Sequence, residues 1–375
     1  MRGIFNRMYV SIYELPCEEK CTRDGAEKSA VSDEGLYGQG FEVIKRCVGS
    51  KGDFIRIRTD YGYEGYVRSG DVIICENTLI CRDNSVCEDT SMFAEGCTNE
   101  SVPICEMSMI CHKKERKDYH KNKQYKLMQV KKSVADILSA PFVSSVRLMS
   151  VTRGAVLRCS GGTSASHLDC NCNTVNESVC DNNKKSDNNA ECTCEKNGYV
   201  CIRLYDGRAG YIKKSYLEPY AAPLDEKEIG RLDEDSFRER LVQTAKSYLG
   251  TQYRWGGKTP LGIDCSGLTS MAYMLNGVYI YRDARLVPGF AVKEIPYECM
   301  KKGDLIYFPG HIAMYTGDGE YIHSTAREGS DGVVINSLDR RSARYREDLA
   351  QSICAVGSIF SACPAKTENR SLNTA

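Results

Sequence analysis

The sequence predicts a chain of the α+β class, in which two small all-β modules precede a larger domain of mixed helices and strands. Short alternating segments with glycine-aromatic turns recur twice before residue 220 and are typical of small barrels. A helical pattern that starts at a cysteine follows later, with histidine-bearing strands downstream of it. A chain of 375 residues is also longer than one typical domain, so we expect about two or three.

The first module is predicted to span residues 1–76. Residues 53–59 alternate cleanly between apolar and polar side chains, and residues 61–67 have the glycine-aromatic composition of a hairpin. Short strands at this spacing predict a closed, barrel-like sheet.

Residues 77–133 interrupt this pattern with spaced cysteines and then a basic run over residues 113–132. A metal site or an anionic partner is the functional alternative, but the cysteine spacings match no Cys-x-x-Cys zinc pattern. We therefore interpret this segment as a solvated insertion or linker, without a metal.

A second module is predicted over residues 134–220, with an Asn-, Ser- and Asp-rich insertion over residues 159–197 that is too polar to form a core. The insertion contains two Cys-x-Cys pairs, for which metal binding stays an alternative. Asp206-Gly207 is a strong hairpin signal. The motif Gly-Tyr-Ile at residues 210–212 resembles Gly-Tyr-Val at residues 65–67, which suggests a loose internal repeat.

The third domain is predicted over residues 235–360. A capping-box pattern at Ser236 begins a helix that is expected to run through Leu249 and to end at Gly250. Further along, Cys265 follows a small polar turn and begins a second helix that reaches about Leu275. Unpaired N–H groups and the helix dipole favour negative charge in a first helical turn, and the thiolate is the nucleophilic form of cysteine.

A nucleophilic cysteine needs a base, usually a histidine. The five histidines are His112, His120, His167, His311 and His323. The first three lie in polar segments, whereas His311 and His323 lie on two consecutive strands. A two-residue turn would place His323 opposite Met314, but a three-residue loop over residues 317–319 places it opposite Ala313, with His311 as its diagonal neighbour on one face. We predict the three-residue loop.

Five segments of this domain, in the same order, resemble the NlpC/P60 family of papain-like cysteine peptidases. They are Tyr253-Arg254-Trp255-Gly256-Gly257, Asp264-Cys265-Ser266-Gly267, Lys302-Gly303-Asp304-Leu305, Gly310-His311-Ile312-Ala313-Met314-Tyr315 and Tyr321-Ile322-His323-Ser324. The resemblance implies a papain-like fold, with Cys265 as nucleophile, His311 as general base and acid, and His323 as the group that orients His311. The two β modules resemble bacterial SH3 domains, notably at residues 36–38 and 65–67.

Two SH3-like barrels before the peptidase domain resemble γ-D-glutamyl-L-diamino acid endopeptidases of the YkfC type. That resemblance implies cleavage of the γ-D-Glu–diamino acid bond in murein stem peptides with a free N-terminal L-Ala. It further implies that Asp283 holds the free amine and that the first barrel closes one end of the cleft. Tyr63 and Glu64 are the candidates for this closing surface.

Other candidate substrate contacts surround the predicted nucleophile. The backbone N–H of Cys265 and the Tyr253 hydroxyl are candidate donors to an oxyanion. Trp255 is a candidate wall of the cleft, with a core tryptophan as the alternative. Asp264 and Ser266 flank the nucleophile and are candidates for substrate contact.

Composition excludes several function classes. Because 50 basic and 50 acidic residues cancel, nucleic-acid binding is not expected, and no apolar run is long enough for a membrane helix. The N-terminus lacks a signal-peptide core, which predicts a cytoplasmic protein, with secretion or wall association as the alternative. Only four of the 20 cysteines follow residue 202, which argues against disulfides in the third domain. No cofactor is expected, and the oligomeric state is left open.

Three alternatives to the peptidase function stay open. The first is a wall-binding protein with a degenerate peptidase domain, and the second is another papain-like amidase or acyltransferase. The third is a cysteine-rich metal-binding protein. The fold alone does not decide among reactions.

Overall fold

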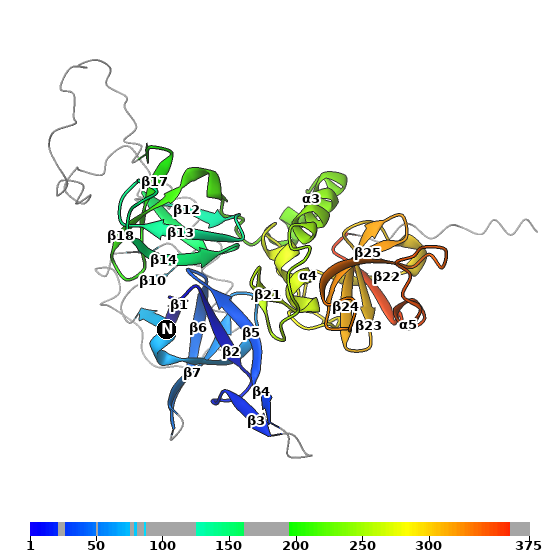
Figure 1. Ribbon diagram of the computed structural model, residues 1–375. Coiled ribbons are helices and arrows are strands. Elements are labelled where there is room, and N and C mark those ends of the chain that lie inside the picture. Colours follow the sequence, from blue (N-terminus) through cyan, green and yellow to red (C-terminus); the bar gives the residue numbers. More distant parts are fainter. Residues whose placement is uncertain are drawn as a thin grey trace, which may run out of the picture. The chain divides into compact units, whose positions relative to one another are not determined.

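The computed structural model describes residues 1–21, 27–49, 52–75, 79–80, 86–87, 125–160 and 195–360 (Figure 1). Residues 113–124 of the basic run, residues 161–194 of the Asn-rich insertion with its Cys-x-Cys pairs, and the first three histidines lie outside these ranges. The chain divides into two compact units. The N-terminal unit comprises residues 1–30, 34–60 and 64–220, and the C-terminal unit comprises residues 221–375 together with two short segments, residues 31–33 and 61–63.

The first sheet of the N-terminal unit has seven strands in the order β5-β2-β8-β7-β6-β1-β9. Its strands are β1 (Arg2–Phe5), β2 (Tyr9–Tyr13), β5 (Val31–Leu36), β6 (Gly40–Gly49), β7 (Gly52–Thr59), β8 (Glu64–Arg68) and β9 (Val72–Cys75). Two small ladders accompany it, formed by β3 (Glu19–Cys21) with β4 (Glu27–Ser29) and by β10 (Leu79–Ile80) with β11 (Val86–Cys87).

The second sheet has eight strands, of which seven follow the order β14-β13-β18-β17-β15-β12-β19 and the eighth, β16, pairs with β17. Its strands are β12 (Tyr125–Val130), β13 (Val134–Leu138), β14 (Arg147–Thr152), β15 (Val156–Ser160), β16 (Glu195–Lys196), β17 (Tyr199–Arg203), β18 (Ala209–Lys213) and β19 (Leu217–Pro219). The sheet begins at Tyr125, ahead of the start at residue 134 predicted from the sequence. The SH3 identity of both sheets and the domain boundaries stay predictions.

The two sheets repeat one topology, which confirms the internal repeat. Each strand of the first order corresponds to one strand of the second, and in each a 3-10 turn separates the last two strands, at Ser69–Asp71 and at Lys214–Tyr216. A Cβ on Gly65 would lie 2.4 Å from Ile12, and one on Gly210 would lie 2.6 Å from Ile137. Both Gly-Tyr motifs therefore begin with glycine because the strand passes directly over an isoleucine of its neighbour.

The two sheets are joined by Tyr37, a residue of the first module that lies in the core of the second. Tyr37, which follows β5, is buried in the apolar cluster of the second sheet. Its carbonyl accepts from the Val156 N–H at 2.9 Å, and its hydroxyl accepts from the Tyr205 N–H at 3.1 Å. Burial raises the pKa of Tyr37 to about 12. These contacts explain why both sheets belong to one compact unit.

The C-terminal unit combines helices with a six-stranded sheet in the order β22-β27-β23-β24-β25-β26. Its helices are α2 (Glu226–Ile229), α3 (Glu234–Lys246), α4 (Cys265–Met274) and α5 (Glu347–Ala350). Its strands are β20 (Lys258–Thr259), β21 (Gly262–Ile263), β22 (Lys293–Ile295), β23 (Leu305–Phe308), β24 (His311–Gly317), β25 (Glu320–Thr325), β26 (Gly332–Ser337) and β27 (Ala355–Ser358).

Helix α4 starts at Cys265, as predicted, and Leu275 caps its end. Helix α3 starts at Glu234 and not at Ser236, because the Asp233 side chain caps it by accepting from the Ser236 N–H at 2.8 Å. The predicted N-cap at Ser236 is therefore wrong by three residues, nearly one helical turn. Helix α4 packs against β24 and β25, and α3 packs against α4 (Figure 1).

Cys299 is disulfide-bonded, so the expectation that no disulfide supports this domain is wrong. The expectation failed because a disulfide requires two sulfur atoms to meet in space, whatever the distribution of cysteines along the chain. Within the described ranges, no helix has both the length and the apolar character needed to cross a membrane.

Candidate active site

Cys265 is the first residue of α4, and Asp264 is its N-cap. The Asp264 carboxylate accepts from the Gly267 N–H at 2.5 Å, which fixes the first turn of the helix. The thiol is 8% exposed, and the backbone of Ile312, the residue after His311, hydrogen-bonds its sulfur. Burial and then the Asp264 charge raise the pKa of Cys265 to about 11, while the backbone groups of Ile312 and Ser266 act in the opposite direction. The thiol is therefore protonated at neutral pH until a base removes its proton.

The two histidines meet on one face of the β24–β25 hairpin, by a different turn from the predicted one. Gly317 pairs with Glu320, so the turn is the two residues Asp318 and Gly319, both at positive φ. The extra residue is instead accommodated by a bulge between Tyr315 and Gly317. The three-residue loop is thus wrong, but the bulge restores the predicted pairing because Met314 pairs with Ile322, one position before His323.

A chain of hydrogen bonds links three side chains from three neighbouring strands. His311 Nε2 lies 2.7 Å from His323 Nδ1, and His323 Nε2 lies 2.8 Å from Asn336 Oδ1. The Asn336 amide donates from Nδ2 to the Arg344 carbonyl at 3.0 Å, which turns its oxygen towards His323. His323 Nε2 must then carry the proton, and its Nδ1 accepts from His311 Nε2–H. With these protons assigned, His311 Nδ1 is the unprotonated nitrogen at the end of the hydrogen-bond chain and can act as the base.

Burial keeps both imidazoles neutral. Desolvation lowers the pKa of His311 to about 4 and the pKa of His323 to about 3. Together with the raised pKa of Cys265, these directions describe a neutral thiol and two neutral imidazoles. The site is therefore suited to general-base removal of the thiol proton as a bond forms, rather than to a resting ion pair.

Asn336 was not found by sequence reasoning. It lies on β26, where His323 pairs with Val334, so Asn336 is two residues further along the same face. The pairing of β25 with β26 depends on the loop over residues 326–331, and no short turn motif there fixes the register. The only available signal was the alternating pattern of residues 332–337.

The predicted oxyanion donors lie near the sulfur. Burial and then the charge of Cys265 raise the pKa of Tyr253, so the Tyr253 hydroxyl is close enough to Cys265 to respond to it. The Cys265 N–H lies in the first turn of α4, where amides have no partner within the helix. Trp255 is 63% exposed, which excludes the alternative of a core tryptophan and leaves it available as a wall.

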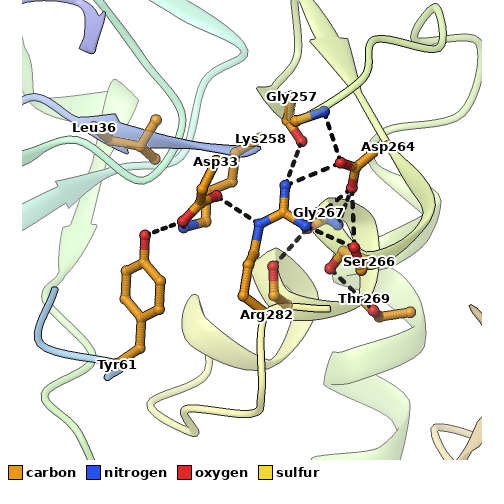
Figure 2. A network of polar contacts seen from close by, with 12 residues as sticks. Asp33, Leu36, Tyr61, Gly257, Lys258, Asp264, Ser266, Gly267, Thr269 and Arg282 are labelled. Carbon is orange, nitrogen blue, oxygen red and sulfur yellow. Dashed lines mark hydrogen bonds and ion pairs between the residues drawn. The ribbon is translucent and has the colours of Figure 1, made fainter. Parts of the chain in front are cut away.

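Asp264 and Ser266 are buried and held by Arg282, as Figure 2 shows. Arg282 donates to both Asp264 oxygens at 3.1 Å and to the Ser266 hydroxyl at 2.7 Å. The Gly256 N–H also donates to Asp264 at 2.9 Å. These two predicted substrate contacts are thus engaged inside the protein.

Asp283 differs from its neighbour Arg282 in having no hydrogen bond or ion pair to its carboxylate within the described part of the chain. Burial raises the pKa of Asp283, and Arg282 and Arg285 oppose that rise. Burial also raises the pKa of Tyr63 to about 12, with a further contribution from the Asp283 charge, and both residues belong to the C-terminal unit. Glu64 belongs to the N-terminal unit, where Arg56 and Arg58 pair with it at 2.9 and 2.7 Å.

Metal binding has no support among the described residues, where no group of three or more His, Cys, Asp or Glu side chains is arranged to hold an ion. The Cys-x-Cys pairs that kept this alternative open lie outside the described ranges.

Comparisons with known proteins identify the family. The sequence profile of the NlpC/P60 family matches residues 250–349. The chain is 35% identical over 328 residues to dipeptidyl-peptidase 6 of Lysinibacillus sphaericus, which covers 88% of this chain and 92% of that protein. It is 34% identical over 131 residues to gamma-D-glutamyl-L-lysine dipeptidyl-peptidase of Bacillus subtilis, or 33% and 41% of the two chains.

A solved structure supports the same assignment at the level of fold. An NlpC/P60 family protein from Bacillus cereus superimposes with a TM-score of 0.55 and 17% identity, covering 95% of this chain and 98% of that one. The family profile and the relative that matches along nearly its whole length agree with the helix-borne cysteine and the paired histidines. The chain belongs to the NlpC/P60 family of peptidases.

Proposed function

We propose that this protein is a cysteine peptidase that hydrolyses the γ-D-Glu–diamino acid bond of murein stem peptides with a free N-terminal L-Ala. The observation that carries the proposal is the hydrogen-bond chain from Asn336 through His323 to His311, since the backbone of Ile312, the residue after His311, hydrogen-bonds the sulfur of Cys265. Cys265 is the nucleophile, His311 is the base and acid, and His323 orients His311.

The reaction proceeds in two balanced steps. His311 Nδ1 takes the Cys265 proton as the sulfur attacks the γ-carbonyl of D-Glu, and the imidazolium then gives that proton to the departing amine. A thioester between Cys265 and the L-Ala-γ-D-Glu acyl group remains. Water then attacks the thioester, with His311 taking one of its protons, and the dipeptide leaves as the thiol reforms. The Cys265 N–H and the Tyr253 hydroxyl stabilise the oxyanion in both steps.

Asp283 supports the free-amine requirement. Its half-buried carboxylate makes no ion pair or hydrogen bond in the described part of the chain, and an ammonium group beside it would gain a charge-assisted hydrogen bond. Tyr63 lies close enough to Asp283 to feel its charge and forms the adjacent wall. The names of two relatives, which specify a γ-D-glutamyl-L-lysine bond, support the same substrate class. The cytoplasmic localisation stays a prediction.

The proposal is tested with the tripeptide L-Ala-γ-D-Glu-meso-diaminopimelate and its N-acetylated form. The wild-type protein should release the diamino acid from the free tripeptide, and Cys265→Ala should abolish release. Cys354→Ala is the matched control, since this exposed free thiol hydrogen-bonds the Tyr307 carbonyl, and it should retain full activity. Cleavage by Cys265→Ala at the wild-type rate would remove the catalytic assignment. No cleavage by the wild type, with binding to insoluble peptidoglycan, would favour the wall-binding alternative.

The amine site is tested separately with Asp283→Asn. We expect KM for the free tripeptide to rise about tenfold or more, since a hydrogen bond to a charged group contributes about 1.5–3 kcal/mol. Asp235→Asn, a surface carboxylate of α3, is the matched control. An unchanged KM would leave the free amine without its proposed partner.

A further inference from the structure

Four charged side chains form a buried cluster at the start of α4 (Figure 2). Asp33 and Lys258 are 0% exposed, Arg282 is 2% exposed and Asp264 is 7% exposed. Two carboxylates and two cations give the cluster no net charge. Three members come from the sequence around Cys265, but Asp33 comes from the short segment 31–33, more than 200 residues earlier in the chain.

Asp33 holds both cations. Arg282 Nε donates to Asp33 Oδ1 at 2.5 Å, and Lys258 Nζ donates to Asp33 Oδ2 at 3.2 Å. The Tyr61 hydroxyl also donates to Asp33 Oδ2, and Lys258 Nζ lies 3.9 Å from the centre of the Tyr61 ring. Burial raises the pKa of Asp33, but Lys258 and Arg282 outweigh it and hold the carboxylate ionised.

The other end of the guanidinium holds the N-cap of α4. Arg282 Nη1 and Nη2 donate to the two Asp264 oxygens, and Asp264 in turn accepts from the Gly267 N–H. This first turn is tightly packed, because a Cβ on Gly267 would lie 2.2 Å from the Gly257 carbonyl oxygen. Displacing Asp264 therefore displaces the turn that begins with Cys265.

We propose that Asp33 is a positioning residue for the nucleophile: by balancing Lys258 and holding Arg282, it keeps Asp264 on the N-terminus of α4 and so places Cys265. The inference rests on the proposed function, in which Cys265 is the nucleophile. It also makes the peptidase unit dependent on a segment contributed from the N-terminal part of the chain.

The cluster also sets the charge around the thiol. The groups that act on Cys265 are the Asp264 carboxylate, the Arg282 guanidinium and the backbone groups of Ser266 and Ile312, and the Tyr253 hydroxyl lies within range of its charge. Removing the Asp33 charge leaves two buried cations facing one carboxylate, an arrangement that proteins tolerate poorly. Lys258 and Arg282 then compete for Asp264.

The test compares Asp33→Asn, the charge-balanced double variant Asp33→Asn/Lys258→Met, and Asp60→Asn. Asp60 is the matched control, a partly buried carboxylate that pairs with Arg2 at 2.6 Å in the first sheet. Two readouts are taken on the full chain: kcat and KM for the free tripeptide, and the rate of Cys265 alkylation by iodoacetamide, followed by mass spectrometry of the Cys265 peptide. Alkylation needs no substrate, so it still reports on Asp33 if the proposed substrate is wrong.

We expect Asp33→Asn to lower kcat at least tenfold with KM changed less than threefold, and to change the alkylation rate at least fivefold. The double variant should recover to within threefold of wild type in both readouts, and Asp60→Asn should match wild type. A purely structural role predicts the reverse, because a second buried substitution adds damage rather than removing it. A folded Asp33→Asn with wild-type rates, or a double variant that is no better than the single variant or fails to fold, would overturn the proposal.

Discussion

Replacing Asn336 with alanine tests the hydrogen-bond chain that orients the base. The substitution removes the 2.8 Å hydrogen bond to His323 Nε2, on an imidazole that is 0% exposed. An unpaired buried donor costs about 1–3 kcal/mol. If about 2 kcal/mol of this is lost in the transition state, kcat falls about 30-fold, since each 1.36 kcal/mol corresponds to tenfold. KM should change little, because Asn336 contacts a histidine and not the proposed substrate.

The assay is steady-state release of the diamino acid from the tripeptide at several pH values. Asn336→Asp keeps the acceptor and adds a negative charge beside the imidazoles, so kcat should stay within about fivefold while the acid limb of the pH profile moves to higher pH. Asn276→Ala is the matched control, an amide that bonds Thr244 and Ala272 at the far end of α4. A loss of less than twofold in Asn336→Ala would refute the reasoning.

Two further predictions concern stability. Because burial lowers the pKa of His311 to about 4 and of His323 to about 3, the unfolded chain binds more protons than the folded one between about pH 4 and 6.5. The free energy of unfolding in urea should therefore fall as pH drops from 7 to 5, by up to about 1.4 kcal/mol per pH unit for each histidine, and His311→Gln should flatten this dependence. Asp304→Ala removes the 2.6 Å partner of buried Arg238 and should destabilise the C-terminal unit by about 3–5 kcal/mol in urea unfolding, and a loss below about 1 kcal/mol would contradict the pairing.

The features set by local sequence were predictable. The start of α4 at Cys265 followed from a polar turn before an apolar helix. The internal repeat was suggested by two Gly-Tyr motifs, and the structure places the glycine of each against an isoleucine of the neighbouring strand. The alignment of His311 with His323 was predicted for a reason that was only partly right, since a bulge and not a longer loop supplies the extra residue. Turn length and bulge position are alternative ways to reach one register, and residue spacing alone does not separate them.

The features that depend on distant contacts were not predictable. Asn336 reaches His323 only because β26 pairs with β25 in one register, and Asp33 reaches Arg282 across more than 200 residues. Tyr37 lies in the core of the second sheet and so joins two sheets that were predicted as separate modules. In each case tertiary packing determines the contact, and the sequence pattern of neither segment alone indicates it.

The most direct test of the central claim is to trap the thioester. Wild-type protein is mixed with the free tripeptide and quenched in acid within the first turnovers, and its peptides are then examined by mass spectrometry. The account predicts that the Cys265 peptide gains the mass of L-Ala-γ-D-Glu less one water. Any variant that slows hydrolysis of the thioester more than its formation should accumulate more of this adduct. An adduct on another cysteine, or tripeptide cleavage that continues in Cys265→Ala, would contradict it.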